Sequence, residues 1–133
     1  MSENNVPKKK RMSKRIMIAE DDQFLANAYR VKLEKENFEV SVVDQGQELL
    51  DKVKDFKPHL ILLDLVMPIM DGFEALKTLK ANKDTKNIPV LITSNLGQQT
   101  DLDKSMKLGA IDYIIKSNVS IKDIVKKVKK LTT

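Results

Sequence analysis

Short apolar runs alternate along the chain with longer amphipathic stretches. A short apolar or alternating run bounded by polar residues is typical of a β-strand. Five such runs are found, at 16–19, 38–42, 60–63, 89–93 and 113–115. Between them, apolar residues recur with helical spacing, most clearly Ile121, Ile124, Val125 and Val128 at i, i+3, i+4 and i+7. The pattern predicts helices over 23–36, 47–56, 73–81 and 98–108, and a last helix that begins near 121.

The alternation of strands and helices predicts an α/β fold, with a doubly wound parallel sheet of five strands covered by helices on both faces. Leu60-Ile61-Leu62-Leu63 is a continuous apolar run, which favours a strand buried on both sides. In sheets of this kind, ligands bind beyond the carboxyl ends of the strands, where the strand order reverses. The residues that follow each strand are therefore the candidates for function.

Acidic residues, hydroxyls and one lysine follow the predicted strands. In chain order they are Glu20, Asp21, Asp44, Asp64, Thr93, Ser94 and Lys116. We expect Asp44 to cap the next helix. Two carboxylates about 4 Å apart repel each other by about 1–4 kcal/mol, so a cluster of three requires a cation. All-oxygen ligands suit Mg²⁺, and the lysine is then available to an anion. Metal, lysine, hydroxyl and carboxylate together indicate a phosphoryl-group site in which a carboxylate can be the nucleophile.

Four sequence blocks resemble the receiver domains of two-component response regulators. The blocks lie at 16–22, 62–72, 89–94 and 108–116, and the resemblance runs from about Arg15 to Leu131. The most specific block is DLVMPIMDG, from Asp64 to Gly72. The resemblance implies the flavodoxin-like strand order 2-1-3-4-5 and a receiver domain over 15–133.

The resemblance also assigns the acidic residues. It implies that Asp64 accepts a phosphoryl group from a sensor histidine kinase or a histidine phosphotransfer protein. Glu20, Asp21, Asp64 and the backbone carbonyl of Val66 would hold Mg²⁺. The domain would be a phosphoacceptor in signalling and not a classical enzyme, with self-catalysed phosphotransfer and autodephosphorylation as its own chemistry.

The remaining edge residues are assigned to charge stabilisation and switching. The resemblance implies that Lys116 contacts the phosphoryl oxygens, while Ser94 and Tyr113 change position together and remodel the surface for an output protein whose identity the sequence does not give. The register of the fourth strand also admits Thr93 as the switch hydroxyl. Counting from Pro89 favours Ser94, and the two side chains point to opposite faces of the sheet.

Two residues depart from the family pattern. Receiver domains usually follow the lysine with proline in a cis peptide, but Ser117 follows Lys116 here. A cis bond without proline costs about 2.5–4 kcal/mol, so we expect a trans peptide. The residue after the switch hydroxyl is usually small, but here it is Asn95, whose amide could crowd or hydrogen-bond the phosphoryl group.

Other interpretations of these residues stay open at this point. Glu20, Asp21 and Asp22 could simply favour the positive N-terminus of the first helix. Tyr113 could be ordinary half-buried packing. The acidic site could be vestigial in a pseudo-receiver that acts as a constitutive protein-interaction adaptor. A hydrolase with an aspartyl-phosphate intermediate is disfavoured because Val66 stands where its second aspartate is expected, and the chain has no glycine-rich nucleotide loop.

The net charge of +5 resides in the first fifteen residues, and residues 16–133 are neutral. We expect residues 1–14 to be a disordered basic tail, either solvated or acting as an import signal or phosphate-binding arm. Nucleic acid is not an expected partner of the domain itself, which has few aromatic residues. The lack of cysteine excludes a disulfide scaffold and thiol catalysis, and no apolar run suits a membrane span or a signal peptide. We therefore expect a cytoplasmic protein.

Overall fold

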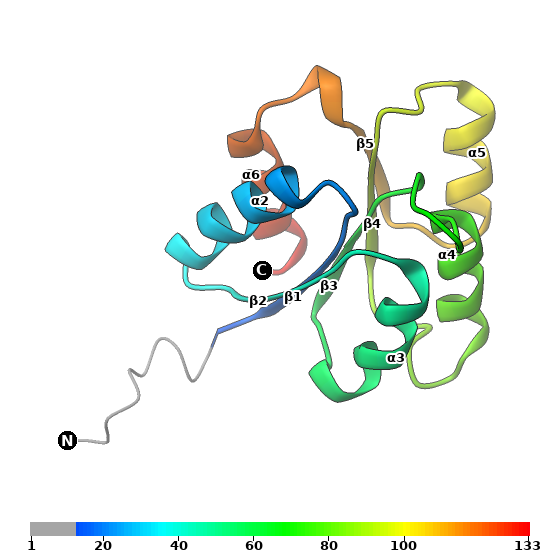
Figure 1. Ribbon diagram of the computed structural model, residues 1–133, viewed down its shortest axis with the longest axis horizontal. Helices are drawn as coiled ribbons and strands as arrows, with labels where there is room; N and C mark the ends of the chain where they lie inside the picture. Colours follow the sequence, from blue (N-terminus) through cyan, green and yellow to red (C-terminus); the bar gives the residue numbers. More distant parts are fainter. Residues whose placement is uncertain (1–12) are drawn as a thin grey trace.

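A five-stranded parallel sheet runs through the middle of the computed structural model, which describes residues 13–133 (Figure 1). The strands lie side by side in the order β2-β1-β3-β4-β5, as the resemblance predicts. They are β1 (Arg15–Ala19), β2 (Glu39–Val43), β3 (Leu60–Leu63), β4 (Val90–Ser94) and β5 (Asp112–Ile115). Each end differs from its predicted position by at most one residue, because the apolar runs that mark the strands are also the buried segments.

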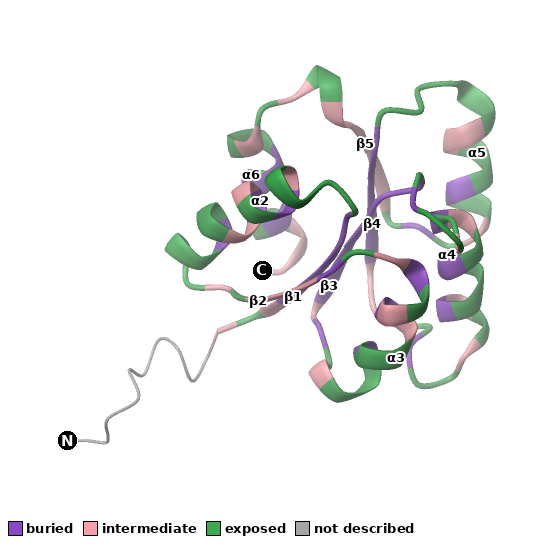
Figure 2. Ribbon diagram, in the orientation of Figure 1, coloured by how far each residue is buried: buried purple, intermediate pink, exposed green. Residues whose placement is uncertain are grey.

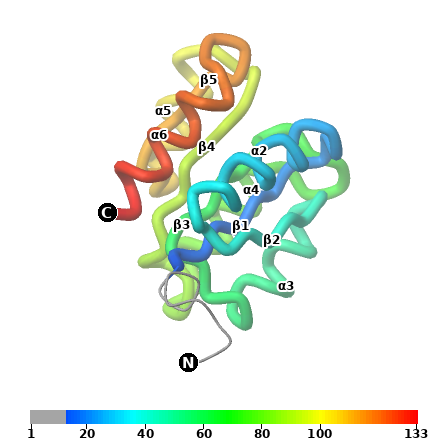
Figure 3. The backbone as a smooth tube through the Cα atoms, turned by 90° about the vertical axis from the view of Figure 1, so that its left-hand side faces the viewer, coloured from blue at the N-terminus to red at the C-terminus, as the bar shows by residue number. Residues whose placement is uncertain are grey.

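Helices cover both faces of the sheet. The α-helices are α2 (Gln23–Lys35), α3 (Gly46–Phe56), α4 (Gly72–Ala81), α5 (Gln99–Lys107) and α6 (Ile121–Leu131), and a short 3₁₀ helix, η1, spans Lys116–Asn118. Figures 1 and 3 show α2 and α6 on one side of the sheet and α3, α4 and α5 on the other. None of the helices in residues 13–133 is long and apolar enough to cross a bilayer.

The sheet divides the core into two apolar clusters, and its central strands are the most deeply buried elements (Figure 2). All four residues of β3 are fully buried, as the continuous apolar run predicts. Their side chains alternate, so that Ile61 and Leu63 pack toward α3 and α4 while Leu60 and Leu62 pack toward α2 and α6. Both faces of the sheet are therefore covered by helices, and a ligand can approach the sheet only at the ends of its strands.

Two expectations concern the N-terminal tail and the N-cap of α3. The predicted tail falls mainly on residues 1–12, outside the described residues, and the carbonyl of Lys14 already accepts a hydrogen bond of 2.9 Å from the Glu39 N–H. The expectation that Asp44 caps α3 is wrong: the N-cap position is Gln45, with no side-chain cap bond. The Asp44 N–H instead donates to Glu48 Oε1 at 3.3 Å, because this acidic residue in the first turn of α3 reaches back over the start of the helix.

Candidate functional site

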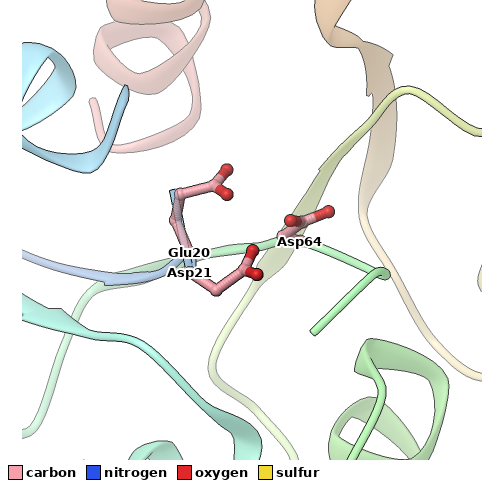
Figure 4. A group of neighbouring side chains, drawn as sticks. All are labelled: Glu20, Asp21 and Asp64. Atoms are coloured by element: carbon pink, nitrogen blue, oxygen red, sulfur yellow. The ribbon is translucent and has the colours of Figure 1, made fainter. Parts of the chain in front are cut away.

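Three carboxylates meet at the carboxyl ends of β1 and β3. Glu20 and Asp21 follow β1 directly and Asp64 follows β3, so pairing of these two strands brings the three together. One oxygen from each lies within 4.8 Å of the others, and Figure 4 shows the three side chains facing a common space. Glu20 and Asp64 are 1% and 4% exposed, whereas Asp21 is open to solvent. The cluster predicted from the sequence is therefore formed, with one side accessible.

Lys116, at the end of β5, is the cation that faces this cluster. Its Nζ lies 2.6 Å from Glu20 Oε1 and 3.3 Å from Asp64 Oδ2. Burial raises the pKa of Glu20 to about 7, although the hydrogen bond from Lys116 acts to lower it. Burial acts to lower the pKa of Lys116, but the hydrogen bond to Glu20 and the charge of Asp64 outweigh it and raise that pKa. Lys116 therefore stays charged beside the two buried acids.

Backbone groups fix the orientation of the two buried carboxylates. The Val66 N–H donates to Asp64 Oδ1 at 3.2 Å, and the Asp22 N–H donates to Glu20 Oε2 at 3.2 Å. Asp22 is itself held in place as the N-cap of α2, accepting from the Leu25 N–H at 3.0 Å. The local turns after β1 and β3 thus aim the carboxylates instead of leaving them to solvent.

The donor set fits a hard divalent cation. Three carboxylates face a single lysine, so the cluster is short of positive charge, and its ligand atoms are all oxygen. Oxygen-only sites with one solvent-exposed carboxylate suit Mg²⁺, which keeps part of its water shell. Glu20, Asp21 and Asp64 could therefore hold such an ion on the accessible side of the cluster.

Replacing Lys116 by methionine is expected to lower the free energy of unfolding by about 3 kcal/mol in metal-free buffer. The change keeps most of the side-chain volume but leaves Glu20 and Asp64 buried without a counter-charge. Mg²⁺ should recover part of the loss by replacing the missing positive charge. Denaturant unfolding with and without Mg²⁺ measures both effects.

The control is Lys127→Met. Lys127 Nζ lies 2.5 Å from Asp112 Oδ2, but these side chains are 31% and 41% exposed. Exposed ion pairs contribute at most about 1 kcal/mol. Lys116 is not the counter-charge of the cluster if both substitutions lower the free energy of unfolding equally. The same holds if Mg²⁺ does not stabilise Lys116→Met more than Lys127→Met.

Ser94 and Tyr113 share one face of the sheet. Ile92 lies opposite Tyr113 in the register and packs in the α3–α4 cluster with it, and Ser94, two residues on, points to the same side. The Tyr113 hydroxyl donates to the carbonyl of Leu96, whose N–H donates to Ser94 Oγ at 3.2 Å. Burial raises the pKa of Tyr113, partly offset by the Ser94 hydroxyl. Thr93 is also buried but faces the opposite side.

The two departures from the family pattern contact each other. The Asn95 side-chain Oδ1 accepts a hydrogen bond of 3.1 Å from the Ser117 N–H. Proline in place of Ser117 could not donate this bond. The Lys116–Ser117 peptide is trans, as expected, like every peptide bond of residues 13–133. In the sequence, Asn95 and Ser117 are two separate departures from the family pattern, and no sequence signal links these residues, which are 22 positions apart.

Comparison with known proteins identifies the family. The family described as "Response regulator receiver domain" matches residues 16–129. This chain is a receiver domain of that family. Receiver domains are signalling domains of two-component systems, as the sequence blocks indicate, and not classical enzymes.

Two curated relatives show how much of other proteins the domain accounts for. The chemotaxis protein CheY of Halobacterium salinarum is 33% identical over 106 residues, which cover 79% of this chain and 86% of CheY. Response regulator RR06 of Streptococcus pneumoniae is 35% identical over 116 residues, 87% of this chain but only 52% of RR06. The chain spans about half the length of RR06 and nearly all of CheY.

Solved structures share the fold over nearly the whole domain. A CheY-like receiver domain protein from Methanospirillum hungatei has a TM-score of 0.82 at 28% identity, covering 90% of this chain and 94% of that one. The phosphorylated cyanobacterial phytochrome response regulator RcpA has a TM-score of 0.77 at 29% identity, with 90% and 91% covered. The Mn²⁺-bound form of response regulator Rcp1 has a TM-score of 0.73 at 28% identity, with 89% and 91% covered.

Proposed function

We propose that Asp64 accepts a phosphoryl group from the phosphohistidine of a sensor histidine kinase or a histidine phosphotransfer protein. The observation that carries this proposal is a carboxylate only 4% exposed at the end of β3, with Lys116 Nζ 3.3 Å from its Oδ2. An Asp64 oxygen attacks phosphorus as the bond from phosphorus to the imidazole nitrogen breaks, and the electron pair stays on that nitrogen. The product is an acyl phosphate, which water can later cleave.

Mg²⁺ is the proposed metal. Its ligands would be Glu20, Asp21, Asp64 and the backbone carbonyl of Val66. When bound, the ion neutralises charge on the phosphoryl oxygens. The mutual approach of the three carboxylates supports this assignment, as do the Mn²⁺-bound form of Rcp1 and the phosphorylated form of RcpA.

Lys116 has two successive partners in this proposal. Before phosphorylation it contacts Glu20 and Asp64, and afterwards its ammonium group contacts the phosphoryl oxygens. The Asn95–Ser117 hydrogen bond joins the loop after β4 to the turn that follows Lys116. It thereby supports the placement of the lysine in a turn without the usual proline. Because the side-chain oxygen of Asn95 accepts a hydrogen bond from the Ser117 N–H, the Asn95 side chain points toward the turn that follows Lys116.

Incubation with acetyl phosphate and Mg²⁺ is expected to add one phosphoryl group per chain, observed by intact mass. The phosphate should be stable in acid and labile in base, as an acyl phosphate is. Excess chelator should prevent labelling and added Mg²⁺ should restore it. Labelling that ignores the chelator contradicts the metal assignment. No labelling under any condition contradicts the proposed function and favours the constitutive adaptor.

Ser94 and Tyr113 are the proposed switch that reports phosphorylation to a partner protein. Their connection through Leu96 supports this, because a moving Ser94 hydroxyl breaks the bond from the Leu96 N–H and disturbs the carbonyl that Tyr113 contacts. We place this signalling in the cytoplasm, with an output protein that binds the remodelled surface.

Ser94→Ala is expected to leave labelling by acetyl phosphate intact and to reduce the structural response several-fold. The response is measured as the difference in amide chemical shifts of α5, β5 and α6 between the labelled and unlabelled forms. Thr93→Ala is the matched control, since Thr93 lies next in sequence but on the opposite face. If Thr93→Ala suppresses the response and Ser94→Ala does not, the switch residue is wrongly assigned.

A further inference from the structure

Two helices that are far apart in the sequence combine into one basic face. α2 and α6 pack side by side over the same apolar cluster (Figures 1 and 3). Residues 23–36 and 121–131 together carry eight basic and three acidic side chains, a net charge of +5. Since residues 16–133 are neutral as a whole, the remainder of these residues carries −5. The neutral sum therefore hides a strongly polarised surface.

The acidic residues of this face are already engaged. Glu34 Oε1 lies 3.6 Å from Arg30 Nη1, and Glu36 Oε1 lies 2.8 Å from Lys129 Nζ. Asp123 completes the capping box of α6. Five lysines of the face are left without an ion pair within residues 13–133, namely Lys32, Lys35, Lys122, Lys126 and Lys130. All five are exposed.

Three of these lysines surround a groove between the helices. Lys32, Lys35 and Lys122 line it together with Glu36 and Val125, and its volume is ≈ 350 Å³. Glu36 also borders a neighbouring hollow of ≈ 410 Å³ that Lys14 and Lys129 line. In the sequence, the run Lys8-Lys9-Lys10-Arg11 comes shortly before Lys14.

The composition of the face distinguishes between possible anionic partners. Protein interfaces have an apolar core and few lysines at the centre. Two large apolar side chains of these helices are exposed, Phe24 at the start of α2, at 86%, and Val31, at 39%, and neither of them lines the groove. Nucleic-acid interfaces are polar and strongly positive, and lysine binds phosphate as a point charge. We propose that this basic face binds duplex nucleic acid through its phosphate backbone, without reading base sequence.

The test is fluorescence anisotropy of a labelled random-sequence DNA duplex titrated with the full chain at several salt concentrations. Nonspecific affinity of about 10⁻⁴–10⁻⁶ M that falls steeply with salt is expected. The triple variant Lys32→Gln/Lys35→Gln/Lys122→Gln should weaken binding roughly tenfold or more at low salt. The slope of log K against log salt should fall by up to about 3, since each phosphate contact contributes about 0.9.

The matched control is Lys77→Gln/Lys83→Gln/Lys107→Gln. It removes the same charge from exposed lysines outside α2 and α6, so its affinity should stay within about twofold of the unsubstituted chain. A second comparison, Lys8→Gln/Lys9→Gln/Lys10→Gln, removes the same charge from the N-terminal run. Circular dichroism melting establishes that each variant is folded.

Several outcomes would overturn the proposal. Equal losses in the α2–α6 and control triples would mean that only net charge matters. A loss confined to the N-terminal triple would move the site to residues 8–10. Binding of poly-glutamate but not of the duplex would make the partner an acidic protein. The measurement uses no phosphodonor, so its failure would leave the role of Asp64 untouched.

Discussion

Replacing Gly72 by alanine is expected to lower the free energy of unfolding by about 3 kcal/mol. A Cβ atom at this position would lie 2.3 Å from the carbonyl oxygen of Asp64 and 2.6 Å from the Cα of Leu65. Both are backbone atoms at the end of a fully buried strand, so neither can move aside as a flexible side chain could. The Gly72 N–H also donates to the Leu65 carbonyl at 2.9 Å, which holds the start of α4 against this backbone.

Gly97→Ala is the matched control for this prediction. A Cβ at Gly97 would meet only Ile115 Cδ1, at 3.4 Å, which is ordinary van der Waals contact. Its cost should stay within about 0.5 kcal/mol. Urea unfolding of the two variants gives the comparison. Equal midpoints would contradict the close contact between the start of α4 and the backbone that follows β3.

The same clash reaches the functional site. The carbonyl that the new Cβ would strike belongs to Asp64, whose carboxylate is the proposed phosphoacceptor. Where the Gly72→Ala chain remains folded, slower labelling by acetyl phosphate is therefore expected as well. The glycine that ends the DLVMPIMDG block thus has a physical reason: it lets the helix start directly against the strand that carries Asp64.

Much of the architecture could be predicted because a buried strand requires apolar residues, and these are visible in the sequence. The run 60–63 is apolar at every position because both faces of β3 are covered, and the acidic residues stand out because they end such runs. The carboxyl ends of parallel strands lie at one edge of the sheet, and the strand order, which makes β1 and β3 neighbours, brings Glu20 and Asp64 together. The Lys116 contact follows from the same topology, since β5 ends at the same edge.

What could not be predicted depends on pairs of residues that only the fold brings together. The Asn95–Ser117 hydrogen bond joins two separate loops, and each residue seen alone looked like a departure from the pattern. The basic face could not be predicted for the same reason, because α2 and α6 lie at opposite ends of the sequence. Acidic residues elsewhere cancel their positive charge in the net charge of residues 16–133. The predicted N-cap of α3 was wrong by one residue: the cap position is Gln45, not Asp44. The backbone N–H of Asp44 instead donates to the side chain of Glu48, in the first turn of the helix.

The substitution Asp64→Asn is expected to abolish phosphorylation completely. The amide keeps the size of the side chain but removes the negative charge that makes the oxygen a nucleophile. It also removes one of the three carboxylates of the proposed metal site. Because Asp64 and Glu20 compete for the single Lys116, the neutral amide should leave the fold intact, with a stronger pair between Lys116 and Glu20.

Asp44→Asn is the matched control. Asp44 is an exposed acidic residue that lines the hollow beside Asp21, so the substitution makes the same change of charge close to the site. Labelling of this variant should proceed at a rate close to that of the unsubstituted chain. The comparison separates a specific acceptor from a general effect of negative charge near the metal ligands.

The most direct measurement is intact mass after incubation of the three chains with acetyl phosphate and Mg²⁺. The unsubstituted chain and Asp44→Asn should each gain one base-labile phosphoryl group, and Asp64→Asn should gain none. Labelling of Asp64→Asn to the same extent as the other two would contradict the assignment of Asp64 as the phosphoacceptor.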